Sequence, residues 1–125
     1  MVIRQSTISD AERIRQIRND CRLSFGTENV IDIQTHISYM LKHGHYYYVA
    51  VEKGNILGFV GVVDEDIRVA VDPKHQGKGI GKKLIKYLMQ RHPSAAAKVK
   101  VTNDASLKMF ESCGFKKTWY ILEKE

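Results

Sequence analysis

Residues 67–84 are the segment that most restricts how this chain folds. A β-rich run, Ile67–Val71, passes through Asp72-Pro73 into a loop with three glycines and then into an amphipathic stretch. Glycine lacks a Cβ atom, so its backbone adopts positive φ and approaches a ligand closely. The first turn of the following helix presents unpaired N–H groups and the positive end of its dipole to the loop. This pattern predicts a strand–loop–helix junction that binds a phosphate or pyrophosphate.

The glycine spacing excludes the two best-known phosphate loops. A P-loop needs G-x-x-x-x-G-K-[ST], but Gly77 and Gly81 enclose only three residues, and Lys82 is followed by another lysine. A dinucleotide-binding fingerprint needs G-x-G-x-x-G, whereas the glycines here stand at 77, 79 and 81. Taken alone, the same loop also suits a plain turn that caps a surface helix.

The loop resembles the acyl-coenzyme A loop of the GCN5-related N-acetyltransferases (GNAT), whose pattern is [Q/R]-x-x-G-x-[G/A]. The resemblance implies that acetyl-CoA is the cosubstrate and that loop amides bind its pyrophosphate. It also implies that the strand before the loop contacts the pantetheine arm, with backbone N–H groups polarising the thioester carbonyl. The cofactor-binding residues expected in the loop are Gln76, Gly77, Lys78, Gly79, Ile80, Gly81 and Lys82. Those expected in the strand are Val69, Ala70 and Val71.

A second segment, residues 103–115, is similar to the GNAT pattern N-x-x-A-x-x-[L/F]-Y-E-x-x-G-F. The resemblance places Asn103 and a short helix beside the coenzyme arm, with Ser106 where alanine is commoner. Phe110 stands where the family often has a tyrosine that protonates the leaving thiolate, and phenylalanine has no proton to give. The additional cofactor-binding residues expected are Asn103, Ser106 and Phe110.

Hydrophobic periodicity predicts the element order β-α-α-β-β-β-α-β-α-β. The expected strands cover residues 2–5, 46–51, 56–63, 67–71, 98–102 and 115–122. The expected helices begin near residues 11, 32 and 79, with a short one inside 103–115 and a loop at 23–32 that contains Gly26. This order agrees with the GNAT fold, an α/β (α+β) architecture in which about four helices flank a central mixed, mostly antiparallel sheet of six to seven strands. The resemblance further implies that strands 67–71 and 97–102 splay apart around acetyl-CoA.

Composition limits the class of protein. With 125 residues, 43% of them hydrophobic and 27% charged, the chain fits one domain over residues 1–125. No apolar run approaches the roughly 20 residues of a membrane span, and Met1–Gln5 does not resemble a signal peptide. Cys21 and Cys113 lack C-x-x-C spacing and suit a reduced compartment. We therefore expect a cytoplasmic protein with no membrane partner.

The formal net charge of +6 is compatible with an anionic partner, which could be nucleic acid, a membrane surface or a small ligand. Basic residues concentrate modestly at Lys74–Lys83, which coincides with the expected pyrophosphate site. Nucleic-acid binding would also need stacking aromatic residues or a recognition helix, so no nucleic-acid partner is expected. His43-Gly44-His45 has no cysteine or acid nearby, and no metal site is expected.

The resemblance implies direct transfer of acetyl to a primary amine, and a base must first deprotonate that amine. Candidate bases are Glu65 and Asp66, before the strand beside the thioester, and His36 on the second helix. Each also suits an ordinary surface or core position. For the missing acid, Tyr120, Tyr87 or water are candidates, and the thiolate leaving unprotonated is the alternative.

The acceptor is the least restricted part of the hypothesis. Arg18-Asn19-Asp20, His36 and Val99-Lys100-Val101 resemble a GNAT subgroup that acts on nucleotide-linked amino sugars. Other small amines, protein N-terminal amines and lysine side chains are alternatives. A non-catalytic acyl-CoA sensor is a further alternative, which Phe110 favours. The expected edge strand at 115–122 is compatible with a homodimer.

Overall fold

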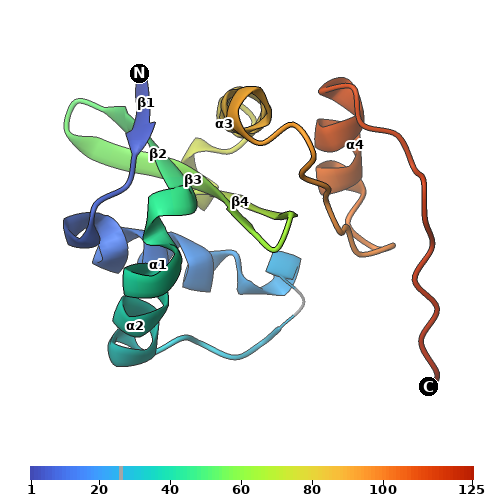
Figure 1. Cartoon of the computed structure of the whole chain (residues 1–125), viewed down its shortest axis with the longest axis horizontal. Helices are drawn as coiled ribbons and strands as arrows, with labels where there is room; N and C mark the ends of the chain where they lie inside the picture. Colours follow the sequence, from blue (N-terminus) through green and yellow to red (C-terminus); the bar gives the residue numbers. More distant parts are fainter. Residues whose placement is uncertain (26) are drawn as a thin grey trace.

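The computed structural model describes residues 1–25 and 27–125, so that Gly26 of the expected loop lies outside the described residues. The elements follow one another along the chain as labelled in Figure 1. The strands are β1 (Val2–Gln5), β2 (Tyr47–Glu52), β3 (Asn55–Val63) and β4 (Asp66–Val71). The α-helices are α1 (Ala11–Asp20), α2 (Ile33–His43), α3 (Ile80–Arg91) and α4 (Asp104–Ser112). Short 3-10 turns are η1 (Ile8–Asp10), η2 (Arg22–Phe25), η3 (Gly44–Tyr46) and η4 (Pro73–His75).

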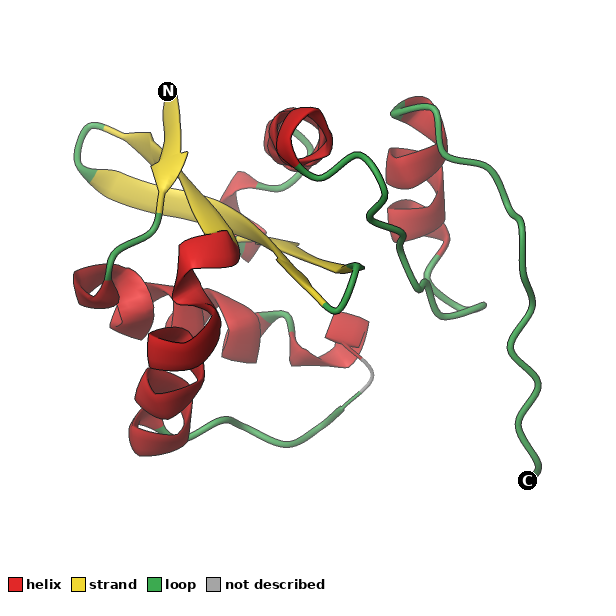
Figure 2. Ribbon diagram, viewed as in Figure 1, coloured by secondary structure: helices red, strands yellow, loops and turns green. Residues whose placement is uncertain are grey.

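The four strands form one antiparallel sheet in the order β1-β2-β3-β4. Helices α1 and α2 cover one face of this sheet and α3 covers the other, with α4 beside α3 (Figure 2). The hairpin between β2 and β3 turns through Lys53 and Gly54, both at positive φ. The mixed helix-and-sheet fold class predicted from the sequence is confirmed.

Two apolar cores lie on the two faces of the sheet. Alternation along each strand sends successive side chains to opposite faces, so β3 contributes to both cores. The core under α1 and α2 includes Ile14, Ile17, Met40, Val49 and Phe59. The core under α3 includes Ala50, Val60, Leu84, Ile85 and Leu88.

The sheet has fewer strands than the six to seven expected, because residues 98–102 and 115–122 form no strand among the described residues. Pairing on the far side of β4 is limited to one parallel bridge between Asp66 and Ala96. The Ile67 N–H donates to the Ala96 carbonyl at 2.9 Å, and the chain then leaves β4 toward α4 (Figure 1). A β-rich sequence needs a neighbouring strand to pair with, and in the part of the chain that the structure describes the pairing with β4 stops at this bridge.

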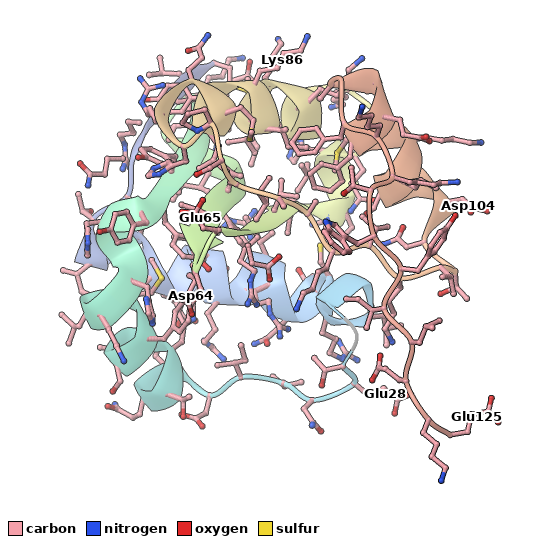
Figure 3. The ribbon with its side chains drawn as sticks, turned by 45° about the vertical axis from the view of Figure 1, so that its right-hand side comes forward. Glu28, Asp64, Glu65, Lys86, Asp104 and Glu125 are labelled. Atoms are coloured by element: carbon pink, nitrogen blue, oxygen red, sulfur yellow. The ribbon has the colours of Figure 1, made fainter. Side chains whose placement is uncertain are left out.

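The segment after α4 is an extended, exposed tail. Trp119 is 87% exposed and Leu122 is 92% exposed. Figure 3 shows Glu125 at the end of this tail, well separated from Lys86 on α3. No helix in the described part of the chain has the length and apolar character needed to cross a membrane.

Candidate active site

Gln76 fastens the glycine loop to the end of β4. Its side-chain amide donates a hydrogen bond to the carbonyl oxygen of Val71 at 3.0 Å. At the base of the loop, the Asp72 carboxylate accepts the Lys74 N–H at 3.0 Å and the Arg13 guanidinium at 2.5 Å. The pKa of Asp72 is held below its usual value, first by the backbone donor of Lys74 and then by Arg13. The loop is therefore anchored to both β4 and α1.

Two of the loop glycines have the conformation that a phosphate-binding loop requires. Gly77 and Gly79 both have a φ of 80°, and Gly79 is the N-cap residue of α3. A Cβ atom at either position would meet no atom within 4 Å, so the loop surface is open. Lys78 and Lys82 are exposed beside it. The arrangement presents an uncovered backbone and the positive end of α3 to solvent.

The next two positions of the loop motif serve helix packing. Ile80 is 6% exposed and belongs to the core under α3. Gly81 is also buried, and a Cβ there would lie 2.6 Å from the sulfur of Met109 on α4. The absence of a side chain at Gly81 therefore lets α3 and α4 approach closely.

The far edge of β4 carries backbone groups directed away from β3. N–H directions alternate along a strand in an antiparallel pair. Because Ile67 donates to Ala96 on the far side, the N–H groups of Val69 and Val71 face that side too. The N–H of Ala70 faces β3, and its side chain is buried under α1. The free edge of β4, formed by the backbone of Val69 and Val71, leads directly into the glycine loop.

The residues of α4 and its N-cap that were expected at the cofactor site stabilise the helix and its packing. Asn103 caps α4, and its side-chain oxygen accepts the Ser106 N–H at 3.1 Å. Phe110 is 6% exposed and packs edge-on against Phe115, with ring centroids 5.2 Å apart. Phe110 thus fills the core between α3 and the chain after α4.

The two acidic candidate bases have different surroundings. Glu65 lies in the turn between β3 and β4, which Figure 3 labels, with a φ of 64°. Its carboxylate accepts a hydrogen bond from the Ser94 hydroxyl, and its carbonyl accepts the Ala96 N–H at 2.8 Å. The Asp66 side chain is 25% exposed, and one of its oxygens lies 3.3 Å from Nε of Arg68.

His36 is buried between α1 and α2, and only 4% of it is exposed. Burial lowers the pKa of His36, so its imidazole is neutral at pH 7. Within the described residues, its Nε2 atom has no hydrogen-bond partner. Tyr120, in contrast, is 83% exposed on the tail and is not brought to the loop or to β4.

The structure gathers four further residues that the site prediction did not assemble. They lie on the sheet face covered by α1 and α2, and we call them the arginine–tyrosine cluster: Arg18, Tyr39, Tyr47 and Arg68. Tyr47 pairs with Gly61 in register, and Gly61 pairs with Arg68, so the three residues form one row across β2, β3 and β4. The Tyr39 and Tyr47 hydroxyl oxygens are 2.6 Å apart.

Charge and burial are unusual in the arginine–tyrosine cluster. The pKa of Arg18 is lowered by burial and by the neighbouring charge of Arg68. Burial also raises the pKa of Tyr47 well above its usual value. Arg68 could have been recognised from the sequence as a charged residue inside an otherwise apolar strand, on the same face as Ala70. The sequence indicated Arg18 only as part of Arg18-Asn19-Asp20, in the resemblance to enzymes that act on nucleotide-linked amino sugars.

Nothing in residues 1–25 or 27–125 groups three or more histidine, cysteine or acidic side chains in a way that would hold a metal ion. A comparison with protein families gives a direct result, since the model of the acetyltransferase (GNAT) family matches residues 11–115. This chain belongs to the GNAT family. The family assignment agrees with the two motifs around the glycine loop and α4.

Individual relatives support the same GNAT assignment. The chain is 36% identical over 70 residues to the peptidyl-lysine N-acetyltransferase YiaC of Escherichia coli K12, covering 54% of this chain and 48% of YiaC. The chain spans about half the length of the curated relatives that it matches, 48% and 54% for the first two.

Solved structures share the fold over more of the chain. The ribosomal-protein-alanine N-acetyltransferase of Brucella melitensis superposes with a TM-score of 0.85 at 21% identity, over 95% of this chain and 86% of that one. YncA of Salmonella typhimurium, solved with its cofactor acetyl-CoA, has a TM-score of 0.79 at 25% identity, over 92% and 79% of the two chains. The GNAT fold predicted from the sequence is thereby confirmed.

Proposed function

We propose that this chain is an N-acetyltransferase that transfers acetyl from acetyl-CoA directly to a primary amine. The observation that carries this proposal is the continuity between the free edge of β4 and the open loop at the N-terminus of α3. Backbone donors at a helix N-terminus suit a pyrophosphate. An adjacent strand edge suits the amide-containing pantetheine arm, which pairs with it as an added strand would. The solved structure of YncA with acetyl-CoA supports this choice of ligand.

In this proposal the loop contributes through its backbone. The N–H groups of residues 77–81 donate to the pyrophosphate oxygens, and Lys78 and Lys82 add positive charge from the rim. Gly77 and Gly79 leave room for the phosphates because no Cβ covers the loop. Gly81 acts indirectly, by allowing α4 to pack against α3.

The chemical step exchanges one bond of the acetyl carbon for another. The amine nitrogen forms a bond to the acetyl carbon, the carbon–sulfur bond breaks, and coenzyme A leaves as a thiolate. The N–H groups of Val69 and Val71 are the donors available to the thioester oxygen, where negative charge develops. We place the approach of the amine on the face covered by α1 and α2, because Val69 and Val71 pack against the core under α3, whereas Arg68 on the α1–α2 face has a side chain that is 42% exposed.

His36 is the best suited of the candidate bases on electrostatic grounds. It is neutral at pH 7 because burial lowers its pKa, and its Nε2 has no hydrogen-bond partner in the described structure. We propose that it accepts the amine proton through water. Glu65 is engaged by Ser94 and Asp66 is paired with Arg68, which makes both less available.

None of the candidate acids in the described residues is placed to protonate the thiolate. Phe110 has no proton to give, and Tyr120 lies on the exposed tail. Tyr87 lies on α3 with its ring stacked under Arg91. We propose that the thiolate leaves unprotonated or takes a proton from water, which an ordinary thiol pKa of about 8.5 allows. A second candidate function is a non-catalytic acyl-CoA sensor, and Phe110 at the tyrosine position is the observation that favours it.

One experiment separates these functions. The protein is mixed with acetyl-CoA and a panel of small amines, amino acids, peptides and nucleotide-linked amino sugars, and free thiol is measured. Thiol release that depends on an amine and is lost in Gly79→Glu supports the transferase. Binding of acetyl-CoA without amine-dependent release supports the sensor. Release by Gly79→Glu at the parent's rate would overturn the proposed cofactor site.

A further inference from the structure

The arginine–tyrosine cluster has no role in holding acetyl-CoA or in the chemical step described above. It lies on the acceptor side of β4, since Arg68 is adjacent in sequence to Val69 and its side chain shares a face with Ala70. Helix α1 supplies Arg18 and helix α2 supplies Tyr39 to the same place. Four elements therefore converge beside the position proposed for the thioester.

Arg68 brings a second positive charge close to Arg18. The charge of Arg68 adds to burial in lowering the pKa of Arg18. Asp66 lies beside Arg68, with one oxygen 3.3 Å from Arg68 Nε but without the alignment of a hydrogen bond. That Nε atom is buried, although 42% of the Arg68 side chain is exposed. A buried guanidinium N–H of Arg68 that has no hydrogen-bond partner in the described structure, with a second arginine nearby, favours an anionic ligand.

Tyr39 and Tyr47 are also suited to an anionic ligand. A single hydrogen bond joins the hydroxyls of Tyr39 and Tyr47, and it uses one of their two hydroxyl hydrogens. Tyr47 is 4% exposed and fixed over Gly61, so its hydroxyl is held in position before any ligand arrives. A rigid hydroxyl pair beside two guanidinium groups is suited to the oxygens of a carboxylate or phosphate.

We propose that the arginine–tyrosine cluster binds an anionic group, a carboxylate or a phosphate, that the acceptor carries a few bonds from its reacting amine. The acceptor is then an amino acid or an amino phosphate, and the cluster discriminates against polycations, which two arginines repel. This inference rests on the proposed acetyltransferase function.

The first test uses matched acceptor pairs and measures thiol release at saturating acetyl-CoA. L-alanine, L-aspartate and L-2,4-diaminobutyrate are compared with their amides, and O-phosphoethanolamine is compared with ethanolamine. We expect the charged member of at least one pair to have a kcat/KM at least tenfold higher than its uncharged partner. A hydrogen bond to a charged group changes binding affinity by about tenfold or more. The amino acid and phosphate arms distinguish the two kinds of anion. Equal kcat/KM within every pair would overturn the inference.

Variants then locate the effect. Arg68→Gln and Arg18→Gln should each raise the KM for the charged acceptor about tenfold or more, without changing acetyl-CoA affinity. Arg91→Gln is the control, because Arg91 lies on α3, where its guanidinium stacks on the Tyr87 ring at 3.5 Å. A loss of the same size in Arg91→Gln, or an unchanged KM in both cluster variants, would contradict the proposal.

A binding measurement keeps the test independent of turnover. In the Gly79→Glu variant, whose loop carries an added negative charge, millimolar succinate or inorganic phosphate should still raise the melting temperature. The added Arg68→Gln change should remove that stabilisation. If neither anion stabilises Gly79→Glu, the cluster is not an anion site. If anions bind but acetyl-CoA does not bind the parent, the transferase proposal fails while the anion site stands.

Discussion

Tyr47 lies with the end of its ring directly over Gly61. A Cβ atom on Gly61 would be 2.6 Å from three atoms of that ring. The two residues are register partners in β2 and β3, and the contact directs the Tyr47 hydroxyl toward Tyr39, 2.6 Å away. The glycine thus allows a large polar side chain to lie flat under α1 and α2 at the acceptor side of the sheet.

Replacing Gly61 by alanine should destabilise the protein. The new methyl group would press on a buried ring that a hydrogen bond holds in place, and overpacking of this kind costs about 1–3 kcal/mol. Gly44→Ala is the matched control, because the nearest atom to a Cβ there is the flexible end of Met40, at 3.4 Å, and the next two atoms are at an ordinary contact distance of 3.9 Å. Urea unfolding followed by circular dichroism measures both, and equal stability of the two variants would contradict the packing described.

Stability should fall at alkaline pH because of Tyr47. Burial raises the pKa of this phenol in the folded protein, whereas an unfolded tyrosine titrates near ~10. The folded state therefore keeps its proton while the unfolded state loses one, so the stabilising effect is complete below pH ~10 and declines above it. The free energy of unfolding as a function of pH should decline less steeply in Tyr47→Phe. An identical decline in parent and variant would rule out Tyr47 as the cause.

Stability should also fall on the acid side of neutrality because of His36. Burial lowers its pKa in the folded protein, whereas an unfolded histidine titrates near ~6.5. The unfolded state then binds the proton more readily, so the stabilising effect present above pH ~6.5 declines as the pH falls through the lower folded value. His36→Gln should flatten this part of the curve. For catalysis, the low-pH limb of kcat/KM should disappear in the same variant if His36 is the base.

The exposed tail gives an optical prediction. Trp119 is the one tryptophan in the sequence and is 87% exposed, so its fluorescence should be typical of a water-exposed indole and change little on unfolding. The measurement is made over a range of protein concentrations. A blue shift that grows with concentration would instead show that the tail is buried between copies, as the homodimer hypothesis for residues 115–122 requires.

The local elements of this fold were predictable from sequence, and the pairing of distant segments was not. The hairpin turn at Lys53-Gly54 and the start of α3 after Gly79 follow from local backbone preferences. The strands expected at 98–102 and 115–122 depend on partners elsewhere in the chain. Residues 98–102 alternate as a strand does, and residues 115–122 are rich in aromatic and β-branched residues. The single bridge at Ala96 shows that pairing ends before either segment begins.

The candidate site divides in the same way. The glycine loop is contiguous in sequence, so its motif was visible directly. The row of Tyr47, Gly61 and Arg68 depends on the register of three strands. That register is a property of the folded sheet, which explains why short sequence matches such as Arg18-Asn19-Asp20 indicated the acceptor side without indicating this row.

Calorimetric titration of acetyl-CoA into the parent, Gly79→Glu and Gly54→Glu tests directly whether the glycine loop binds the coenzyme. Gly54 and Gly79 have nearly equal φ values, 78° and 80°, and a Cβ on either meets no atom within 4 Å. The two variants therefore carry the same backbone strain and the same added charge at different places. We expect the parent and Gly54→Glu to bind acetyl-CoA and Gly79→Glu not to bind it. No binding by the parent, or equal binding by both variants, would contradict a coenzyme site at the loop.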